Sequence, residues 1–501
     1  MVLLILWGVA CYAFFQLKYQ YHFFYEEQNQ LFLLSGEYIG SYLQKPAAMA
    51  CLVGDFLTQF YYYMYAGAAI LTLSLLLMGD VMYRSVKALV PKSNERVASW
   101  AAFCIAIIAM TICARLSLYE DYRLSSIIAI AGGCAMFWLM DIAICALPRK
   151  QAPAGTSQHA YSRKHVLVIT IIVVAVLLWS LLTFQLFGYG FWFFFVLMII
   201  RIPGLCKEYG LPQWASGVLV AISFIPLSCV IIPFAPSYYN LTIDDVLTYP
   251  GLGKWVNYDA EMAAERNLKY DNTYYFGRYS KVKEMYEQET GEPTPEMSFF
   301  YCLSLEQLGM LADRLPEMKN PFLGTFLKID DKTPLYQTKM INELYYLLGD
   351  MTYTERAALL ANTFSPNGRN VRMVKRLAEA NLISGDTVAA MKYLRLLQKT
   401  LVYRQWAKDR TPGTQTPAVK GELERKQQYI NTTDNIRIGD DCYTIMTQLL
   451  DSNPKNSVAL DYLLCSDMLA RQREVFIHDF EKYGPSPRPI FQQIYNSAKE
   501  Q

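Results

Sequence analysis

The hydrophobic and polar positions divide the chain into two parts. Seven long apolar stretches fill residues 1–235, and no stretch of comparable length follows in residues 236–501. A bilayer core of about 30 Å takes roughly 20 apolar residues in a helix. The pattern therefore predicts about seven membrane-spanning helices, which we expect near residues 1–17, 61–79, 97–117, 124–147, 166–186, 188–203 and 213–235.

The fifth and sixth of these stretches form one apolar run, which is interrupted at Gly188-Tyr189-Gly190. A single helix through the whole run would be far longer than the bilayer is thick. We therefore expect the chain to turn back at the two glycines and to form a tight hairpin of two spans. The alternative is one tilted span followed by a re-entrant piece.

The second part of the chain has the periodicity of amphipathic helices and little of the alternation that marks strands. In its clearest unit, Gly385 ends one helix in a left-handed cap and Asp386 begins the next. Such a helix–turn–helix is similar to a tetratricopeptide repeat, and these repeats stack into a solenoid with a concave binding surface. The expected fold class is all-α: a polytopic transmembrane helical bundle followed by a soluble, tetratricopeptide-like α-solenoid. Further candidate repeats lie at residues 337–364 and 453–480.

Charged side chains are concentrated in the second part. Residues 236–501 carry 66 of them and residues 1–235 carry 24, so we expect the domain boundary after residue 235. The net charge of +2 provides no basic field, which argues against nucleic acid as a partner. Eight of the eleven cysteines lie in the membrane half, and the three in the tail form neither a disulfide framework nor a zinc pattern.

Basic residues in the loops predict the orientation of the spans. Three alternate loops, at residues 80–96, 148–165 and 201–212, carry ten Lys and Arg, whereas the other three loops carry four. The positive-inside rule then places the amino terminus in the cytoplasm, and seven spans place the tail on the opposite side. We expect a multi-pass protein of the bacterial inner (cytoplasmic) membrane with a periplasmic carboxy-terminal domain.

Residues 18–60 form the longest loop on the outer side, and two adjacent carboxylates, Glu26 and Glu27, stand near its beginning. Acids in the first turn of a helix are favoured by the helix dipole, which is the ordinary explanation. The functional alternative makes Glu26 or Glu27 catalytic, taking a proton from an acceptor hydroxyl or binding a metal. Helical spacing of apolar positions predicts one amphipathic helix in this loop, closed by Pro46, with Phe24, Leu31, Leu34, Tyr38 and Tyr42 on its apolar face.

Two arginines flank the short second outer loop. Arg115 and Arg123 stand beside Glu120 and Asp121. A guanidinium donates two hydrogen bonds at once to a phosphate, so these arginines are candidates to bind the phosphate of a lipid-linked substrate. A local ion pair with the neighbouring acids is the other interpretation.

No cofactor is identified from the sequence. The chain has no phosphate loop, dinucleotide fingerprint, His-Glu-x-x-His motif or Gly-x-Ser-x-Gly elbow. A divalent metal stays open, because three pairs of adjacent aspartates occur, although helix caps and turns explain such pairs better. The pairs are Asp244-Asp245, Asp330-Asp331 and Asp440-Asp441.

The order of features in the first 80 residues resembles the C-type membrane glycosyltransferases. The resemblance rests on the carboxylates Glu26 and Glu27 after the first span, the helix through Tyr42, and the Lys45-Pro46 turn before the next span. Those enzymes take sugars from polyprenyl-phosphate donors, place a catalytic acid in the first outer loop and often have a soluble carboxy-terminal domain. The resemblance therefore implies a polyprenyl-phosphate-linked glycan as a substrate.

Several segments also resemble a family of Bacteroidota membrane proteins that has no established function. This second resemblance supports the topology and implies no activity. The segments run from Glu27-Gln28 to Gln59-Phe60, from Phe299 to Arg314, from Arg376 to Ile383 and from Tyr393 to Ala407.

Two functions fit this architecture. The first is a glycosyltransferase-like enzyme that acts on a lipid-linked substrate at the periplasmic face. The second is a non-enzymatic scaffold, anchored in the bilayer, whose helical-repeat domain binds envelope proteins. A transporter fits less well, because transporters have ionisable residues at mid-membrane and the predicted spans have few.

The charge asymmetry of the loops yields a test of the topology. Alkaline phosphatase fused after Gln501 should be active, because the enzyme requires export from the cytoplasm and the tail is expected outside it. A cytoplasmic fluorescent reporter at the same site should be dark. The opposite pair of results would overturn the count of seven spans.

Overall fold

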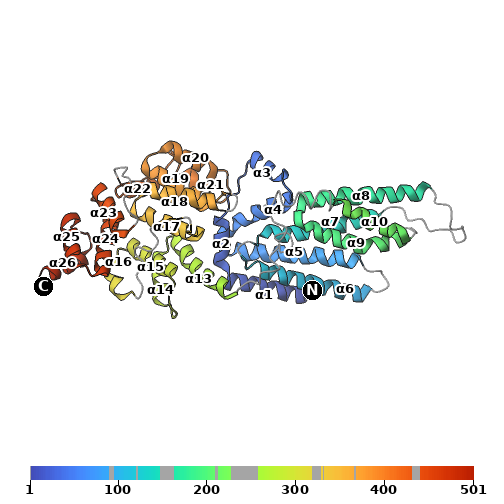
Figure 1. Cartoon of the computed structure of the whole chain (residues 1–501), viewed down its shortest axis with the longest axis horizontal. Helices are drawn as coiled ribbons and strands as arrows, with labels where there is room; N and C mark the ends of the chain where they lie inside the picture. The colour runs from blue at the N-terminus through green and yellow to red at the C-terminus, as the bar shows by residue number, and fades with distance from the viewer. Residues whose placement is uncertain are drawn as a thin grey trace. The chain divides into compact units, whose positions relative to one another are not determined.

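Every regular element in the described part of the chain is a helix, as the periodicity predicted (Figure 1). The structure is a computed structural model that describes residues 2–89, 95–119, 122–146, 163–208, 213–226, 258–318, 329–330, 332–365, 368–431 and 441–500. Contacts divide the chain into a membrane unit, residues 1–23 and 35–262, and a tail unit, residues 24–34 and 263–501. The boundary expected after residue 235 lies outside the described residues.

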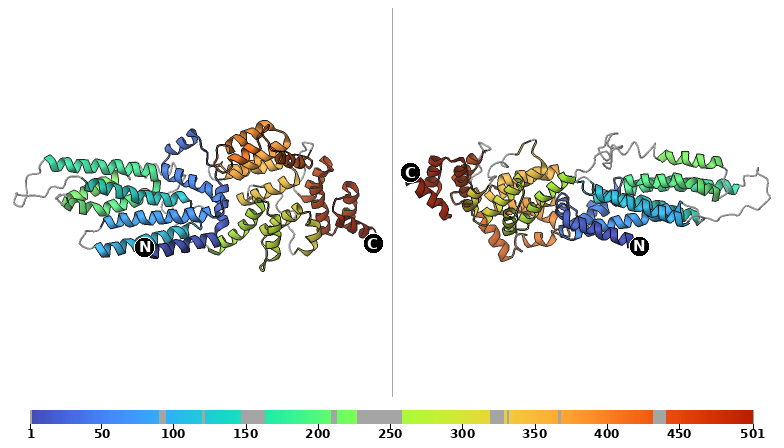
Figure 2. Two further views of the ribbon diagram at one scale, coloured as in Figure 1. Left: turned by 180° about the vertical axis from the view of Figure 1, so that it is seen from behind. Right: turned by 90° about the horizontal axis from the view of Figure 1, so that it is seen from below.

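Long helices run side by side in the membrane unit, and every helix named below except the short one at residues 20–28 overlaps a predicted apolar stretch (Figures 1 and 2). In the described residues, four stretches are long and apolar enough to cross a membrane, or five if the bent pair of α1 and α2 counts as one span. Because one of the four runs through both α8 and α9, the total of seven spans stays a prediction. The helices are α1 (Val2–Lys18), α2 (Gln20–Gln28), α5 (Ala66–Ala88), α6 (Glu95–Leu116), α7 (Leu124–Cys145), α8 (Arg163–Phe187), α9 (Phe191–Glu208) and α10 (Gln213–Pro226).

The chain turns back between α8 and α9 at a short 3-10 turn, η3 (Gly188–Gly190). Trp179 of α8 donates a hydrogen bond to the carbonyl of Met136, and Arg201 of α9 pairs with Asp141 at 2.8 Å. Since both reach the same part of α7, the two helices are antiparallel and form the expected hairpin. Arg201, which was counted above with the basic loops, is therefore a buried partner of Asp141 inside the bundle.

The single amphipathic helix expected in the outer loop was wrong. The loop holds α3 (Gly36–Leu43), α4 (Ala48–Thr58) and the 3-10 turn η1 (Gln59–Tyr62), while residues 29–35 between α2 and α3 are not helical. The main chain there bonds to the tail helices, which the local apolar spacing does not reveal: the Gln30 carbonyl accepts from Val371, and the Leu34 amide donates to the Lys399 carbonyl.

Helix α4 packs against α7 and α8 in the membrane unit. Gly54 permits this crossing, because a Cβ atom built there would lie 2.8 Å from the Cβ of Ser125 in α7. No side chain larger than hydrogen fits between the two helices at that point. The crossing places α4 over the beginning of α7.

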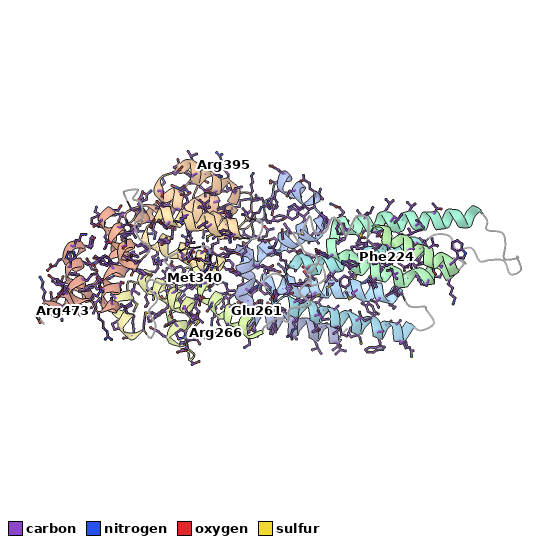
Figure 3. The ribbon with its side chains drawn as sticks, in the orientation of Figure 1. Phe224, Glu261, Arg266, Met340, Arg395 and Arg473 are labelled. Atoms are coloured by element: carbon purple, nitrogen blue, oxygen red, sulfur yellow. The ribbon has the colours of Figure 1, made fainter. Side chains whose placement is uncertain are left out.

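The tail unit consists of helices that pack mainly on their neighbours in sequence, such as α17 on α18, α18 on α19 and α19 on α20. Met340 of α17 is buried among them, whereas Arg395 and Arg473 point away from the helices (Figure 3). The helices are α13 (Tyr258–Tyr275), α14 (Tyr279–Glu287), α15 (Pro295–Gln307), α16 (Leu311–Arg314), η5 (Leu315–Glu317), α17 (Leu335–Leu348), α18 (Met351–Phe364), α19 (Val371–Ser384), α20 (Thr387–Leu397), α21 (Arg404–Asp409), α22 (Pro417–Gln427), α23 (Cys442–Ser452), α24 (Ser457–Ala470), α25 (Arg473–Tyr483) and α26 (Pro489–Glu500).

The cap predicted between α19 and α20 is confirmed. Gly385 has a φ of 85° at the end of α19, and the carboxylate of Asp386 accepts a hydrogen bond from the Ala389 amide at 2.9 Å. Only glycine adopts this left-handed conformation without strain. The turn therefore fixes where one helix ends and the next begins.

Replacement of this glycine should destabilise the protein through the backbone alone, because nothing lies within 4 Å of a Cβ built at Gly385. Gly385→Val should lower the free energy of unfolding by about 1–2 kcal/mol. Gly421→Ala is the matched control, since Gly421 lies inside α22 with equally open space, and alanine there should stabilise by about 0.5–1 kcal/mol. Thermal unfolding of the detergent-solubilised chain measures both; an unchanged midpoint for Gly385→Val would contradict the cap.

Candidate functional site

Glu26 and Glu27 stand at the end of α2, in a segment that belongs to the tail unit. Glu27 is 2% exposed, and Tyr403 donates a hydrogen bond to its carboxyl group at 3.0 Å. Burial raises the pKa of Glu27 to about 8, although Tyr403 and the charge of Lys375 lower it. Glu27 therefore keeps its proton at neutral pH. Glu26 is half-buried.

The residues after Glu27 continue into the tail helices. We call residues Phe24–Leu34 the strap. Arg372 donates to the Gln28 side chain at 3.1 Å, and Asn370 donates to the Asn29 side chain at 3.2 Å. Lys339 also donates to the Asn29 side chain. Main-chain hydrogen bonds to Val371 and Lys399 complete the attachment, so the strap is a built part of the tail unit.

Arg372 is also the centre of a buried ion network. Its guanidinium pairs with Asp271 of α13 at 2.8 Å and with Glu343 of α17 at 2.9 Å. Arg376 pairs with the other oxygen of Glu343 at 2.6 Å and with Glu379 at 3.0 Å. Burial alone would raise the pKa of Glu343, but the two arginines lower it to about 2. The network joins α13, α17 and α19 by paired charges and the strap by a hydrogen bond to Gln28, which is a structural role.

A different site lies in the membrane unit, where a cavity of about 470 Å³ opens beneath α4. Its walls are mostly apolar and come mainly from α4, α6, α7, the η3 turn and the first turn of α9. A cavity of this size and lining suits part of an apolar chain. Among its lining residues are Ala50, Cys51, Cys113, Tyr122, Ser125 and Trp192.

Charged groups gather where Cys51 of α4 lines this cavity. Burial raises the pKa of the Cys51 thiol to about 11; the charge of Asp55 raises it further, while Arg123 and Lys45 lower it. Asp55 follows Cys51 by one helical turn and accepts a hydrogen bond from the Tyr42 hydroxyl at 2.6 Å. The thiol that lines the apolar cavity thus lies within the electrostatic influence of two cations and one carboxylate.

This arrangement brings together some of the predicted residues and not others. Arg123 is half-buried directly before the first residue of α7, whereas Arg115 is exposed in the last turn of α6. Glu120 and Asp121 lie outside the described residues. Glu26 and Glu27 belong to the tail unit and Arg123 to the membrane unit, so neither unit by itself contains both.

Asp55 was missed as a candidate by the sequence analysis. The available signal was that Asp55 is the single charged residue of the otherwise apolar helix α4. An isolated carboxylate in such a helix needs a polar partner, and Tyr42 supplies it.

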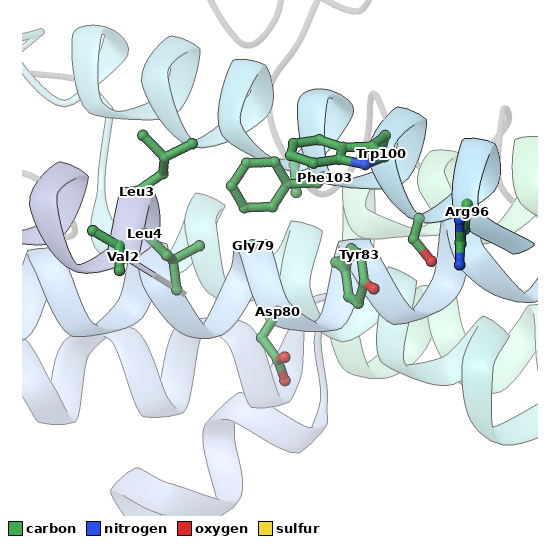
Figure 4. Close-up of a pocket in the computed structure, with 11 residues that line it drawn as sticks. Val2, Leu3, Leu4, Gly79, Asp80, Tyr83, Arg96, Trp100 and Phe103 are labelled. Carbon is green, nitrogen blue, oxygen red and sulfur yellow. The ribbon is translucent and has the colours of Figure 1, made fainter.

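A second hollow in the membrane unit, about 860 Å³ in volume, lies between the beginning of α1 and helices α5 and α6 (Figure 4). Trp100 and Phe103 line its apolar part, and Asp80 and Arg96 lie along it. Asp80 is already paired with Arg84 at 2.8 Å. Among the described residues that line this hollow, the one carboxylate thus already has a counter-ion.

No group of three or more His, Cys, Asp or Glu in the described ranges is placed to hold a metal ion. Asp441 caps α23 by accepting from the Thr444 amide, and Asp330 holds a turn through the Lys332 amide. The described members of two acid pairs thus act as cap and turn residues. Asp244-Asp245, Asp331 and Asp440 lie outside the described residues.

Comparison with known proteins places the chain in a family. A family model matches residues 1–498. The chain belongs to DUF6057, a family of unknown function. No curated protein and no solved structure matches it. Membership of DUF6057 confirms the expectation of an uncharacterised family and leaves the activity to be argued from the site.

Substitution of Glu27 distinguishes a structural role of its buried carboxyl group from a catalytic one. A buried, protonated carboxyl that only accepts from Tyr403 should tolerate Glu27→Gln, whereas Glu27→Ala should cost about 1–3 kcal/mol of stability. In the unfolded chain the carboxyl ionises near its ordinary pKa of 4.5, while the folded one keeps its proton up to about pH 8. Wild-type stability is therefore lost between these values as pH rises, and glutamine removes that loss.

Thermal unfolding of wild type and Glu27→Gln between pH 5 and 8 measures this difference. The two proteins should be nearly equal at pH 5, and the glutamine variant should become relatively more stable toward pH 8. Loss of function in a stably folded Glu27→Gln protein would instead support the catalytic prediction for this residue.

Proposed function

We propose that the protein is a multi-pass enzyme of the bacterial inner membrane that transfers a glycosyl or glycosyl-phosphate group from a lipid-linked substrate at the periplasmic face. One observation carries the proposal: Cys51 lines an apolar cavity, and the charges of Arg123, Lys45 and Asp55 all act on its pKa. A lipid phosphate has the matching chemistry, with an apolar chain joined to an anionic group.

In this proposal the cavity beneath α4 holds part of the polyprenyl chain. Arg123 and Lys45 bind the phosphate, because a guanidinium donates paired hydrogen bonds and an ammonium adds a compact charge. Arg123 directly precedes α7, and the amino-terminal end of a helix favours an anion. Arg115, in the last turn of α6, stays a predicted second phosphate ligand.

Asp55 is the proposed general base. Its carboxylate takes the proton of an acceptor hydroxyl as the acceptor oxygen bonds to the anomeric carbon of the sugar. The bond from that carbon to the phosphate oxygen breaks, and the released lipid phosphate keeps its negative charge against Arg123 and Lys45. The Tyr42 hydroxyl, which lies 2.9 Å from that of Tyr38, donates to Asp55 and fixes its orientation.

The orientation of the protein, the fold of the tail and the remaining candidate residues have separate support. The excess of basic residues in alternate loops supports a cytoplasmic amino terminus and a periplasmic tail. The pairing of neighbouring helices in the tail supports a tetratricopeptide-like solenoid. A divalent metal stays open as a cofactor, and Glu26 and Glu27 stay predicted catalytic residues alongside Asp55.

A scaffold is the second candidate, and one observation favours it. Phe364 of α18 and Val388 of α20 are 73% and 83% exposed on the tail unit, and Leu359 of α18 is also exposed. Exposed apolar side chains of this size often mark a surface that binds another protein. An envelope protein bound there would make the tail a docking platform.

The enzyme proposal predicts a strong effect at Asp55. Loss of a general base slows a reaction by roughly 10²–10⁴-fold, so Asp55→Asn should accumulate the lipid-linked sugar substrate in membranes as a gene deletion does. Arg123→Gln should do the same by weakening phosphate binding. Lipid-linked sugars extracted from a complemented deletion strain are quantified by mass spectrometry, with membrane abundance of the protein measured in parallel.

Glu37→Gln is the matched control, because Glu37 is an exposed acid of the same outer loop. It should restore the wild-type profile. If Asp55→Asn and Arg123→Gln also restore it at normal abundance, the transferase proposal is wrong and the scaffold is the better account.

A further inference from the structure

The strap is followed directly in the chain by α3, the helix that contacts the proposed site. Its last hydrogen bond to the tail joins the Leu34 amide to the Lys399 carbonyl at 2.8 Å. The next residue, Ser35, caps α3 by accepting from the Tyr38 amide. Tail attachment therefore ends one residue before the cap of α3.

Helix α3 in turn holds the proposed base. Tyr38 and Tyr42 stand one turn apart on α3, and their hydroxyl groups are 2.9 Å from each other. The Tyr42 hydroxyl donates to Asp55 at 2.6 Å, and α3 packs against α4. A rotation of α3 by a fraction of a turn would remove this hydrogen bond, because its donor is fixed to one face of the helix.

We infer that the tail unit positions Asp55 through the strap, so that attachment of the strap controls the geometry of the site beneath α4. Gln28 and Asn29 are the positioning residues on the strap, and Arg372 and Asn370 are their partners on α19. The inference rests on the proposed function for the identity of the site. It concerns regulation, since any ligand of the tail that released the strap would also release the beginning of α3 from its connection to the tail.

The strap side chains suit this role because their partners do not depend on them. Arg372 keeps two carboxylate partners, Asp271 and Glu343, when Gln28 is replaced. The ion network of the tail is therefore expected to survive a change at Gln28, and only the attachment of the strap weakens. A purely structural role of the network would leave α4 unaffected by the same change.

The native thiol of Cys51 reports on α4 without any need for activity. It is half-buried in α4, whereas Cys134 of α7 and Cys302 of α15 are buried at 0% and 1% exposure. The full-length protein in detergent is exposed to N-ethylmaleimide, and alkylation of each cysteine peptide is followed by mass spectrometry over time. Cys134 and Cys302 serve as internal references for the membrane unit and the tail unit.

Gln28→Met keeps the size of the side chain and removes its hydrogen bond to Arg372. Alkylation of Cys51 should accelerate about tenfold, the factor expected for loss of one hydrogen bond to a charged group in a local opening. Rates at Cys134 and Cys302 should not change. Leu34→Pro removes the amide that bonds Lys399 and should give the same result, which guards against a folding defect of one variant.

Asn342→Ala is the matched control. Asn342 is a buried amide of α17 that donates to the Thr354 carbonyl at 2.7 Å, and the change should leave Cys51 at its wild-type rate. Equal rates for Cys51 in wild type and both strap variants would overturn the inference. So would a parallel rise at Cys51, Cys134 and Cys302, because it would show general loosening. Neither outcome bears on the transferase test at Asp55, which is read from lipid-linked sugars.

Discussion

The buried guanidinium of Arg372 is the constraint on which the tail unit depends. At 2% exposure it has lost its hydration, and an unpaired charge in that position would cost several kcal/mol. Asp271, Glu343 and Gln28 supply the partners, and they come from α13, α17 and the strap. The two carboxylates fix α13 and α17 around the charge of α19, and the hydrogen bond to Gln28 adds an outer-loop segment to the same unit.

Because the strap is attached to the tail unit, the carboxylates of the outer loop lie in two different environments. Glu27 is a buried partner of Tyr403 with a raised pKa, whereas Asp55, Arg123 and Lys45 all act on the pKa of Cys51, which lines the cavity. Asp55 is therefore a better candidate than Glu27 for the catalytic carboxylate that the first outer loop was expected to supply. The strap then has two consequences, a fixed attachment to the tail and a fixed beginning for α3.

Periodicity in the sequence predicted the long helices, but it failed in the outer loop, where residues 29–35 are not helical, and it does not identify which helices are partners. The apolar stretches, the hairpin at Gly188–Gly190 and the cap at Gly385 are all local signals, and each is confirmed. The strap could not be predicted, because Gln28 and Arg372 are 344 residues apart and nothing local marks either as the partner of the other. Asp55 was missed for a related reason: its importance comes from a cavity that several helices form together.

Hydrogen exchange of the strap amides in the full-length protein tests the central claim most directly. If the strap is a built part of the tail unit, the Leu34 amide should exchange far more slowly than an open loop, because it donates to the Lys399 carbonyl and opens only when the strap detaches. Exchange at the rate of an open loop, with α19 still protected, would contradict the account. In that case neither Glu27 nor α3 would have the environment described here.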